Sequence, residues 1–326
     1  MVNFDKLCGK KVIVTGGAGF VGSHLCEELV SHGAVVTSID NYSAGKIENI
    51  AFLEKYDNFN AIDIDVCDKS SRMDEIFVDV DTVFNNAASK KNICLVDPYR
   101  DLEVNAAGTL NLLEMSIKHK VRKFIHASTG SVYGEPSVFP TTEDHPLKPV
   151  SYYGVSKLAG ERYVEVFNHL YGLDTTILRY FHVYGTRQES NEFGGVVSIF
   201  LRNIMEGRDL TVFGHGEQVR SFTWVKDLVA VNLACALSKK SKAQTYNVAS
   251  GIKVSVNELA KKLIVMMGAE KNIKIVHGEP LIGDIMYFDI SNEKIREHLG
   301  VSFEQDFWGT MSRTIDDFQK YLKTQS

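Results

Sequence analysis

The chain has 326 residues, of which 44% are hydrophobic and 24% are charged, a balance typical of soluble globular proteins. The 36 basic and 41 acidic residues give a net charge of −5, which argues against a nucleic-acid binder. No apolar run approaches the ~18 to 20 residues of a membrane span, and the first residues lack the apolar core of a signal peptide. We therefore expect a cytoplasmic protein whose partners include neither nucleic acid nor a membrane.

The cysteines are scattered along the chain and form no CxxC pair. Their number is odd, and a dispersed, odd set speaks against both a disulfide framework and a zinc site. The sequence therefore predicts no metal site. It predicts buried free thiols at Cys8, Cys26, Cys67, Cys94 and Cys235.

Short apolar runs alternate with longer amphipathic stretches through the first half of the chain. A strand at 11–15 precedes a helix from about 20 to 32, which ends before Gly33, and a second strand follows at 34–39. Further strands are predicted at 60–64, 82–84, 123–127 and 175–178, and helices at 97–119 and 153–171. Such alternation is typical of an α/β fold with a doubly wound parallel sheet and right-handed crossovers.

The pattern changes after Arg179, where the sequence becomes less regular and richer in glycine. We expect a first domain over 1–179, joined by segments near 221–250. Residues 180–326 should mainly form a smaller, discontinuous C-terminal lobe. The segment 245–249 (TYNVA) is predicted to be a strand that returns to the first sheet.

A glycine-rich segment, Thr15–Gly22 (TGGAGFVG), lies between the first strand and the first helix. Gly16, Gly19 and Gly22 are spaced three residues apart. Their missing side chains permit a tight turn, a close approach of the backbone to a pyrophosphate, and close helix–strand packing. The N-terminus of the following helix then faces the negative charge of the phosphates.

An acid follows this turn at the position that a dinucleotide site requires. Asp40 ends the second strand, 18 residues after Gly22. A carboxylate there accepts hydrogen bonds from both hydroxyls of an adenosine ribose and repels a 2′-phosphate. The next residue is Asn41 rather than an arginine. The cofactor is therefore predicted to be NAD rather than NADP.

Tyr153 and Lys157 are four residues apart on a predicted helix and share one of its faces. A tyrosine with a reference pKa of ~10 is a poor base at neutral pH, but a nearby ammonium stabilises the phenolate. Thr129 follows a strand at the sheet edge where ligands bind, so its hydroxyl can reach the same substrate oxygen. Tyr152 is the rival base; Tyr153 is favoured because Lys157 is at i+4 from it.

Two further segments complete a pattern: LRYFHVYG at 178–185 and VRSFTWVKD around Arg220. Together with TGGAGFVG and the YxxxK pair with its upstream threonine, they resemble the extended short-chain dehydrogenase/reductase family, and within it the nucleotide-sugar epimerases and dehydratases. The resemblance reaches to about Leu299. It implies an N-terminal Rossmann lobe, a small sugar-nucleotide lobe, retained NAD, and a homodimer formed by the helices at 97–119 and 153–171.

The resemblance also implies roles for individual residues. With the turn and Asp40, the implied cofactor residues are Gly16, Gly19, Phe20, Val21, Gly22, Asp40, Asn41, Asp65, Val66, Ala87, Ala88, Lys90, Asn105, Tyr153 and Lys157. The implied substrate residues are Lys90, Thr129, Tyr153, Tyr180, His182, Phe213 and Arg220. Asp65 and Val66 would flank the adenine, and Asn105 would contact cofactor or neighbouring backbone. Arg220 would clamp the nucleotide diphosphate, and Phe213 would stack on the base or pack in the core.

The chain departs from the family that it resembles at three places. The 4,6-dehydratases follow the threonine with an Asp–Glu pair, and the uronate decarboxylases carry a glutamate at the second of these positions. Here the two positions are Gly130 and Ser131, which leaves oxidation and reduction at C4 of the sugar. His182 stands where an asparagine is usual, and the segment 283–288 (GDIMYF) lacks the arginine that often follows its Gly–Asp pair.

The sequence thus predicts a NAD-dependent epimerase that acts at C4 of a nucleotide-activated hexose through a 4-keto intermediate. The UDP-linked glucose/galactose pair or the corresponding N-acetylhexosamines are the expected substrates. One alternative is a dehydratase or reductase of the same fold whose acid comes from elsewhere, such as Glu135 or Glu143. Another is a non-catalytic NAD-binding regulatory module, against which the intact set of Thr129, Tyr153 and Lys157 argues.

Overall fold

The computed structural model describes residues 4–89, 93–191, 194–280 and 286–323. Its strands are β1 Lys11–Thr15, β2 Val35–Asp40, β3 Phe59–Asp63, β4 Thr82–Asn85, β5 Lys123–Thr129, β6 Asp174–Tyr180, β7 Val183–Tyr184, β8 Leu210–Phe213, β9 Val219–Ser221, β10 Thr223–Trp224, β11 Gln244–Val248, β12 Lys253–Ser255 and β13 Ile275–Gly278. Its α-helices are α1 Phe20–Ser31, α2 Ser71–Ile76, α3 Ile93–Val96, α4 Pro98–Leu102, α5 Thr109–Lys118, α6 Tyr152–Tyr171, α7 Val196–Met205, α8 Val225–Leu237, α9 Val256–Met266, α10 Glu293–Leu299 and α11 Phe307–Lys323. Within these ranges, no helix is long and apolar enough to cross a membrane.

A seven-stranded parallel sheet forms the centre of the molecule, in the order β11-β6-β5-β4-β1-β2-β3. From β1 the chain builds β2 and β3 on one side and then β4, β5 and β6 on the other. Val12 of β1 accordingly lies between Val36 of β2 and Thr82 of β4. The predicted doubly wound α/β fold is confirmed. Its strand order reverses at β1 and β4, so a ligand crevice is expected at their carboxyl ends.

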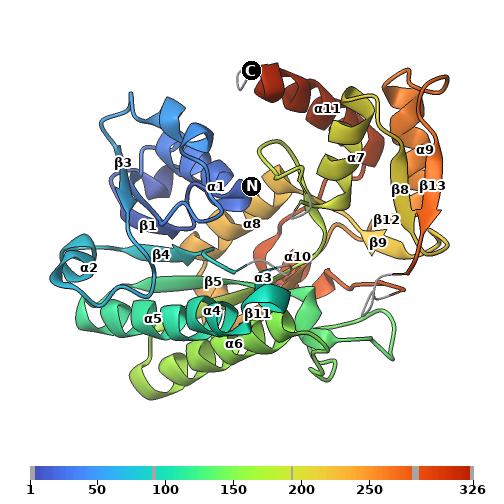
Figure 1. Cartoon of the computed structure of the whole chain (residues 1–326). Coiled ribbons are helices and arrows are strands. Elements are labelled where there is room, and N and C mark those ends of the chain that lie inside the picture. Colours follow the sequence, from blue (N-terminus) through green and yellow to red (C-terminus); the bar gives the residue numbers. More distant parts are fainter. Residues whose placement is uncertain (1–3, 90–92, 192–193, 281–285, 324–326) are drawn as a thin grey trace.

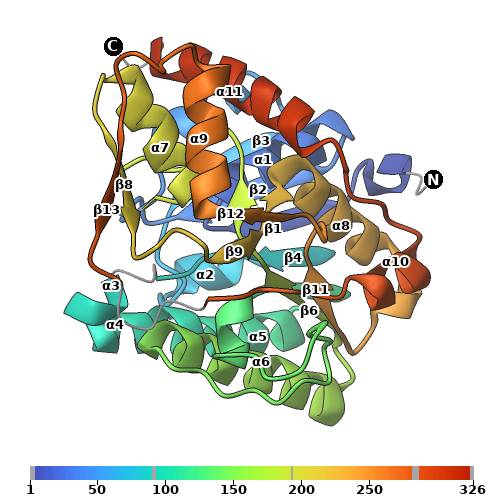
Figure 2. The same cartoon turned by 90° about the vertical axis from the view of Figure 1, so that its right-hand side faces the viewer.

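Helices cover both faces of this sheet (Figures 1 and 2). Val12 and Val14 of β1 belong to one apolar layer together with residues of α1 and α8. Ile13 belongs to the opposite layer, with residues of α2, α5 and α6. A parallel strand that is buried on both faces needs a continuous apolar run, which the first strand supplies. Because its side chains are packed on both faces of the sheet, β1 is a rigid support for the glycine-rich turn that follows it.

A second apolar cluster is built by the C-terminal part of the chain. β8 pairs with β13 in parallel, and β9 pairs with β12 in antiparallel. The cluster contains buried side chains of α7, α9 and α11, including Phe200, Leu259 and Met311. Figure 1 shows these elements together at the upper right, beside the large sheet. The strand predicted at 245–249 is β11, which leaves this part of the chain and pairs with β6 in the large sheet.

The helix predicted at 97–119 is interrupted. It consists of α4, a π-helical turn at Glu103–Gly108, and α5. The turn lies where α6 comes closest: a Cβ on Gly160 would be 2.7 Å from the Asn105 carbonyl oxygen. This interruption depends on a neighbouring helix, and the local sequence pattern carries no signal of it.

The prediction of buried cysteines is right for some of them only. Cys26, Cys94 and Cys235 are buried, and all five cysteines are free. Cys8 is exposed and Cys67 is half-buried, which contradicts the prediction. Both lie in turns, before β1 and after β3, and connecting segments run over the surface of a domain.

Candidate active site

The glycine-rich turn joins β1 to α1 with almost no free space around it. Gly16 has a φ of 63°, which a glycine adopts without strain. A Cβ on Gly16 would lie 3.0 Å from the Cα of Ala87, and a Cβ on Gly22 would lie 2.8 Å from the carbonyl carbon of Gly16. Side chains are therefore excluded at both positions. The N-terminus of α1 opens into the groove beyond the turn.

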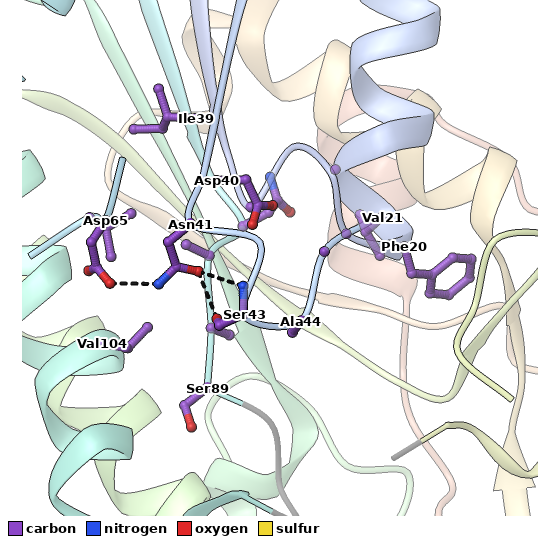
Figure 3. Close-up of a pocket in the computed structure, with 18 of the residues that line it drawn as sticks. Phe20, Val21, Ile39, Asp40, Asn41, Ser43, Ala44, Asp65, Ser89 and Val104 are labelled. Atoms are coloured by element: carbon purple, nitrogen blue, oxygen red, sulfur yellow. Dashed lines mark hydrogen bonds between the residues drawn. The ribbon is translucent and has the colours of Figure 1, made fainter. Parts of the chain in front are cut away.

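That groove has a volume of about 470 Å³ and runs along the carboxyl ends of β1, β2 and β4 (Figure 3). The predicted cofactor residues that line it are Gly16, Gly19, Phe20, Val21, Gly22, Asp40, Asn41, Asp65, Val66, Ala87, Ala88 and Tyr153. Lining residues that the sequence reasoning missed are Ile39, Ser43, Ala44, Gly45, Ile64, Asn86, Ser89, Arg100, Val104, Gln188 and Glu189. Several of these are immediate neighbours of predicted residues, which is the signal that could have found them.

Asp40 is held at the end of β2 by two backbone amides. Its Oδ2 accepts a hydrogen bond from Ala18 N at 3.0 Å, and its Oδ1 accepts one from Tyr42 N at 2.9 Å. Burial raises the pKa of Asp40, and these two hydrogen bonds oppose the rise. Each carboxylate oxygen keeps a second lone pair. Asp40 therefore presents a fixed hydrogen-bond acceptor to the groove.

Asp65, Asn41 and Arg100 form a polar group further along the same wall. The Asn41 amide donates to Asp65 Oδ2 at 2.6 Å, and Figure 3 shows these side chains facing each other. The Arg100 guanidinium pairs with the same carboxylate. Burial alone would raise the pKa of Asp65, but hydrogen bonds from Cys67 N, Arg100 and Asn41 outweigh it and lower the pKa. Arg100 comes from α4 and was not predicted as a site residue.

Tyr153 lies in the first turn of α6, which Ser151 caps by accepting from Gly154 N at 3.1 Å. A Cβ on Gly154 would lie 2.7 Å from the Ser131 carbonyl oxygen, so α6 starts in close contact with the turn after β5. This contact brings Tyr153 beside Thr129. Tyr153 is half-buried and lines the groove, whereas Tyr152 is 58% exposed and does not.

Lys157 lies one helical turn beyond Tyr153 and is 1% exposed. Burial lowers the pKa of Lys157 to about 8, against the opposing charges of Glu161 and Asp101. Burial also raises the pKa of Tyr153 to about 12; Asp101 adds to this rise, and the Thr129 hydroxyl opposes it. Burial and the Asp101 charge thus raise the pKa of Tyr153, where the sequence reasoning expected Lys157 to lower it.

Asn105 was predicted to contact cofactor or neighbouring backbone, and the structure places it behind the groove wall. It is fully buried, and its Oδ1 accepts from Ser89 N at 3.1 Å. Its Nδ2 donates to Asp101 Oδ1 and to Ser156 Oγ, each at 3.0 Å. Asn105 thus joins the segment after β4 to α4 and α6. It lines no part of the groove itself.

Two of the predicted substrate residues, His182 and Arg220, converge on the ring of Phe288. The His182 ring contacts Phe288 at a centroid distance of 4.9 Å, and the Arg220 guanidinium lies 5.8 Å from the same ring. Arg220 is buried, and the His182 backbone has a positive φ of 36°. Phe213, at the end of β8, is 43% exposed, so core packing is not its role.

Tyr180 ends β6 and points its hydroxyl toward two asparagines. That hydroxyl donates to Asn232 Oδ1 at 3.0 Å and lies 3.3 Å from Asn86 Oδ1. Asn86 lines the groove, so Tyr180 contacts a lining residue without lining the groove itself. Lys90 and the Gly283–Asp284 pair lie outside the described residues.

Gly130, the residue after Thr129, is packed against an aromatic ring. A Cβ on Gly130 would lie 2.6 Å from Cδ1 and 2.9 Å from Cζ of Phe181. Phe181 is 2% exposed and stacks on Tyr133, with ring centroids 6.3 Å apart. The next residue, Ser131, places its hydroxyl oxygen 3.3 Å from Thr129 Oγ1. Neither Gly130 nor Ser131 offers a carboxyl group, and the packing at Gly130 leaves no room for a side chain that carries one.

The two acids considered as substitutes do not line the groove. Glu143 Oε1 accepts from Asn247 N at 2.7 Å, and Glu143 borders a separate pocket with Arg179. Glu135 is exposed. The groove that contains Tyr153 therefore receives no catalytic acid from either residue.

Comparison with known proteins identifies the family. The model of the NAD dependent epimerase/dehydratase family matches residues 12–249. The crystal structure of UDP-glucose 4-epimerase from Thermotoga maritima with UDP-glucose is 37% identical, has a TM-score of 0.89, and covers 96% of this chain and 99% of that chain. The UDP-glucose 4-epimerase of Mycolicibacterium smegmatis is 32% identical over 95% of this chain and 98% of the relative. The UDP-N-acetyl-alpha-D-glucosaminuronate decarboxylase of Bacillus cytotoxicus is 36% identical over 82% of this chain and 83% of the relative.

The groove fits the cofactor that this family uses. Further relatives were crystallised with NAD. Here the turn at Gly16 and Gly22 excludes side chains, and Asp40 presents a fixed acceptor at the end of β2. The cofactor is therefore NAD. The chain belongs to the NAD dependent epimerase/dehydratase family, in agreement with its resemblance to the extended short-chain dehydrogenases/reductases.

Proposed function

We propose that this protein is a NAD-dependent 4-epimerase of a UDP-linked hexose and works through a 4-keto intermediate. Two of the relatives described above are UDP-glucose 4-epimerases, and each matches at least 95% of this chain. UDP-glucose and UDP-galactose, or the corresponding N-acetylhexosamines, are the proposed substrates. A decarboxylase is about as similar in sequence to this chain as these epimerases are. The choice between the two reactions therefore depends on the residues at the site.

The adjacent Thr129 and Tyr153 carry the acid–base chemistry in this proposal. Tyr153 removes the proton from the 4-hydroxyl and later returns it to the same oxygen, while the Thr129 hydroxyl holds that oxygen. NAD held in the groove would supply reversible hydride transfer at C4, so that the reaction would show no net oxidation. Lys157 holds the nicotinamide ribose and places a positive charge beside Tyr153.

The observation that carries the proposal is the packing of Phe181 against Gly130. Elimination across C5 and C6 needs a base at C5 and an acid at the 6-hydroxyl, in addition to the groups at C4. Gly130 and Ser131 occupy the positions of the dehydratase acids, and Phe181 fills the space that a side chain on Gly130 would need. With Thr129 and Tyr153 engaged at C4, oxidation and reduction at C4 is the chemistry that remains.

We further propose that residues 180–326 mainly bind the nucleotide-sugar, while 1–179 and the returning segments near 221–250 bind NAD. The Arg220 guanidinium is buried beside Phe288, where a planar donor suits bidentate contact with a diphosphate. His182 lies against the same ring and can donate to that diphosphate. The exposed Phe213 ring is free of the core and suits stacking on the base.

Product analysis by NMR tests the reaction. The NAD-loaded enzyme is incubated with UDP-, dTDP-, GDP- and CDP-hexoses in deuterated water, with Tyr153→Phe as the matched control. We expect a C4 epimer of a UDP-hexose that keeps its own hydrogen at C4 and gains no deuterium at C5. A 4-keto-6-deoxy product, or deuterium at C5, would refute the proposal and redirect attention to Glu135 and Glu143. Absence of turnover with every sugar would favour a regulatory NAD-binding module.

We also propose that the protein forms a homodimer through α4, α5 and α6. α4 packs against α6. Tyr99 of α4 is 84% exposed, and α6 exposes Val155, Val166 and Leu170 by 53%, 46% and 63%. Apolar side chains gathered on neighbouring helices are typical of a protein–protein interface. Sedimentation analysis should give a dimer for the parent and a monomer for Leu170→Glu; a monomeric parent would contradict the proposal.

A further inference from the structure

Arg100 is a charged residue of the groove that has no part in the proposed reaction. It lies on α4, and its side chain is 31% exposed. Asp97 caps α4 by accepting from the Arg100 backbone amide at 2.9 Å. The guanidinium pairs with Asp65 through Nη2, and its Nη1 donates to Glu103 Oε2 at 2.5 Å. These contacts hold the backbone and the side chain of Arg100 in place at the groove.

The two ion pairs use only the edge of the guanidinium. All five N–H groups of an arginine lie in the plane of the guanidinium, and Asp65 and Glu103 accept from two of them. The two faces of that plane carry no N–H group. They are weakly hydrated and stack well on flat rings. Arg100 therefore brings to the groove a flat cationic surface whose position is fixed at its edge.

The position of Asp65 shows which end of the groove Arg100 occupies. β2 and β3 lie on one side of β1, and β4 and β5 lie on the other. Asp40 at the end of β2 is in register with Asp63 at the end of β3, and Asp65 follows two residues later. Arg100 is therefore on the β3 side of the glycine-rich turn, opposite Thr129 at the end of β5. A dinucleotide with its phosphates at the turn and its adenosine ribose at Asp40 directs its adenine toward this end.

The other residues at this end suit a flat apolar ring. Ile64 and Val66 follow β3, and Val104 belongs to the turn at Glu103–Gly108; all three line the groove. Ile64 and Val66 are 5% and 6% exposed, so they are packed firmly into the domain. A purine among such side chains is shielded from water, and a contact between a cation and an aromatic face is stronger where water is excluded.

We propose that Arg100 is a cofactor-binding residue: its guanidinium, held by Asp65 and Glu103, is the surface on which the adenine ring of NAD stacks. Guanidinium planes of arginine serve as stacking partners for bases in nucleic-acid recognition, and a cation over an aromatic face is attracted by the ring. The inference rests on the cofactor and not on the proposed reaction at C4.

Calorimetry on stripped protein, without sugar, tests this role with AMP and NAD as ligands. Arg100→Met keeps an unbranched apolar side chain but removes the cationic plane, so both ligands should bind roughly five- to tenfold more weakly. The factor should be the same for AMP, because AMP contains the adenine but not the nicotinamide half of NAD. The matched control Arg162→Met removes an arginine that is paired with Glu165 at the same i,i+3 spacing, and it should leave both affinities unchanged.

Two further variants separate stacking from ion pairing. Arg100→Lys keeps the charge that pairs with Asp65 but has no flat surface, so it should bind NAD about as weakly as Arg100→Met. Arg100→Tyr loses the charge but offers a flat ring, so its affinity for NAD should lie within about threefold of that of the parent. Circular dichroism identifies the folded variants.

Three results would each overturn the proposal. The first is an Arg100→Met variant with the affinity of the parent. The second is an Arg100→Lys variant that binds NAD more tightly than Arg100→Tyr does, which would assign the effect to the ion pair. The third is a loss for NAD without a loss for AMP, which would place the contact outside the adenine. Since no sugar is present, none of these results depends on which reaction the enzyme catalyses.

Discussion

Gly130→Ala tests directly whether the wall beside Thr129 has room for a side chain. The added methyl carbon would lie 2.6 Å from Cδ1 and 2.9 Å from Cζ of Phe181. Carbon atoms in favourable contact are ~3.5 to 4.0 Å apart. Cε1 of Phe181 would lie closer still to the added carbon than these two atoms, so the ring has to move by more than about 1 Å. Phe181 cannot do so freely, because its ring lies between Tyr133 and Phe288 at centroid distances of 6.3 and 6.0 Å.

The expected loss of stability follows from two opposing effects. Adding a methyl group to a closely packed core costs about 1 to 3 kcal/mol. Replacing glycine with alanine also reduces the entropy of the unfolded chain, which stabilises the fold by about 0.4 to 1 kcal/mol. The net loss in the free energy of unfolding is therefore about 1 to 2 kcal/mol. For a chain of this size, we expect the Tm to fall by about 1.5 to 3 °C.

Urea unfolding of the NAD-loaded enzyme, followed by circular dichroism, measures this loss. Ser131→Ala is the matched control. It removes a hydroxyl whose hydrogen bond with Thr129 Oγ1 is long, at 3.3 Å. Its effect on the free energy of unfolding should therefore stay within about 0.5 kcal/mol. Gly130→Ala combined with Phe181→Leu should recover part of the loss, because the two substitutions share one space. A Gly130→Ala variant as stable as the parent would show that the wall is open. That result would support the dehydratase alternative.

Three further substitutions test the remaining roles. Tyr153→Phe should lower turnover by at least ~100-fold with little change in substrate binding; near-normal turnover, or a larger loss in Tyr152→Phe, would show that the wrong tyrosine was chosen. Asp40→Asn should weaken NAD binding to stripped protein by roughly tenfold, through the loss of charged hydrogen bonds, and should narrow the preference over NADP measured by calorimetry. Arg220→Ala should cost ~2 to 5 kcal/mol of binding to the free nucleoside diphosphate; undiminished inhibition by that diphosphate would place Arg220 outside the site.

The large sheet is predictable because its strands are short apolar runs bounded by turn residues, and that signal is local. β1 ends where the sequence predicts, and β5 runs on to Thr129 because the ladder with β6 continues to Tyr180. The π-turn at Glu103–Gly108 is not predictable in the same way. It depends on the close approach of α6 at Gly160, a tertiary contact that helix periodicity does not encode.

The residues of the candidate site also fall into those placed by local sequence and those placed by tertiary contacts. Gly16 and Asp40 could be assigned from the sequence, because a strand, a turn and a helix within a short segment determine their geometry. Arg100 could not, because it reaches Asp65 from a helix 35 residues later in the chain.

Burial explains why the acid–base pair differs electrostatically from the expectation drawn from its spacing. Residues four apart on an exposed helix would stabilise each other's charges, but here the surroundings disfavour both charged forms. Burial raises the pKa of Tyr153 to about 12 and lowers that of Lys157 to about 8. At neutral pH the phenol therefore keeps its proton, and Asp101 reinforces this state. In the proposed reaction, proton removal by Tyr153 would need a further positive charge near the phenol, and the oxidised nicotinamide ring of NAD held in the groove would supply one. Under this proposal Tyr153 would act as a base only with oxidised NAD bound, which would couple proton and hydride transfer at C4.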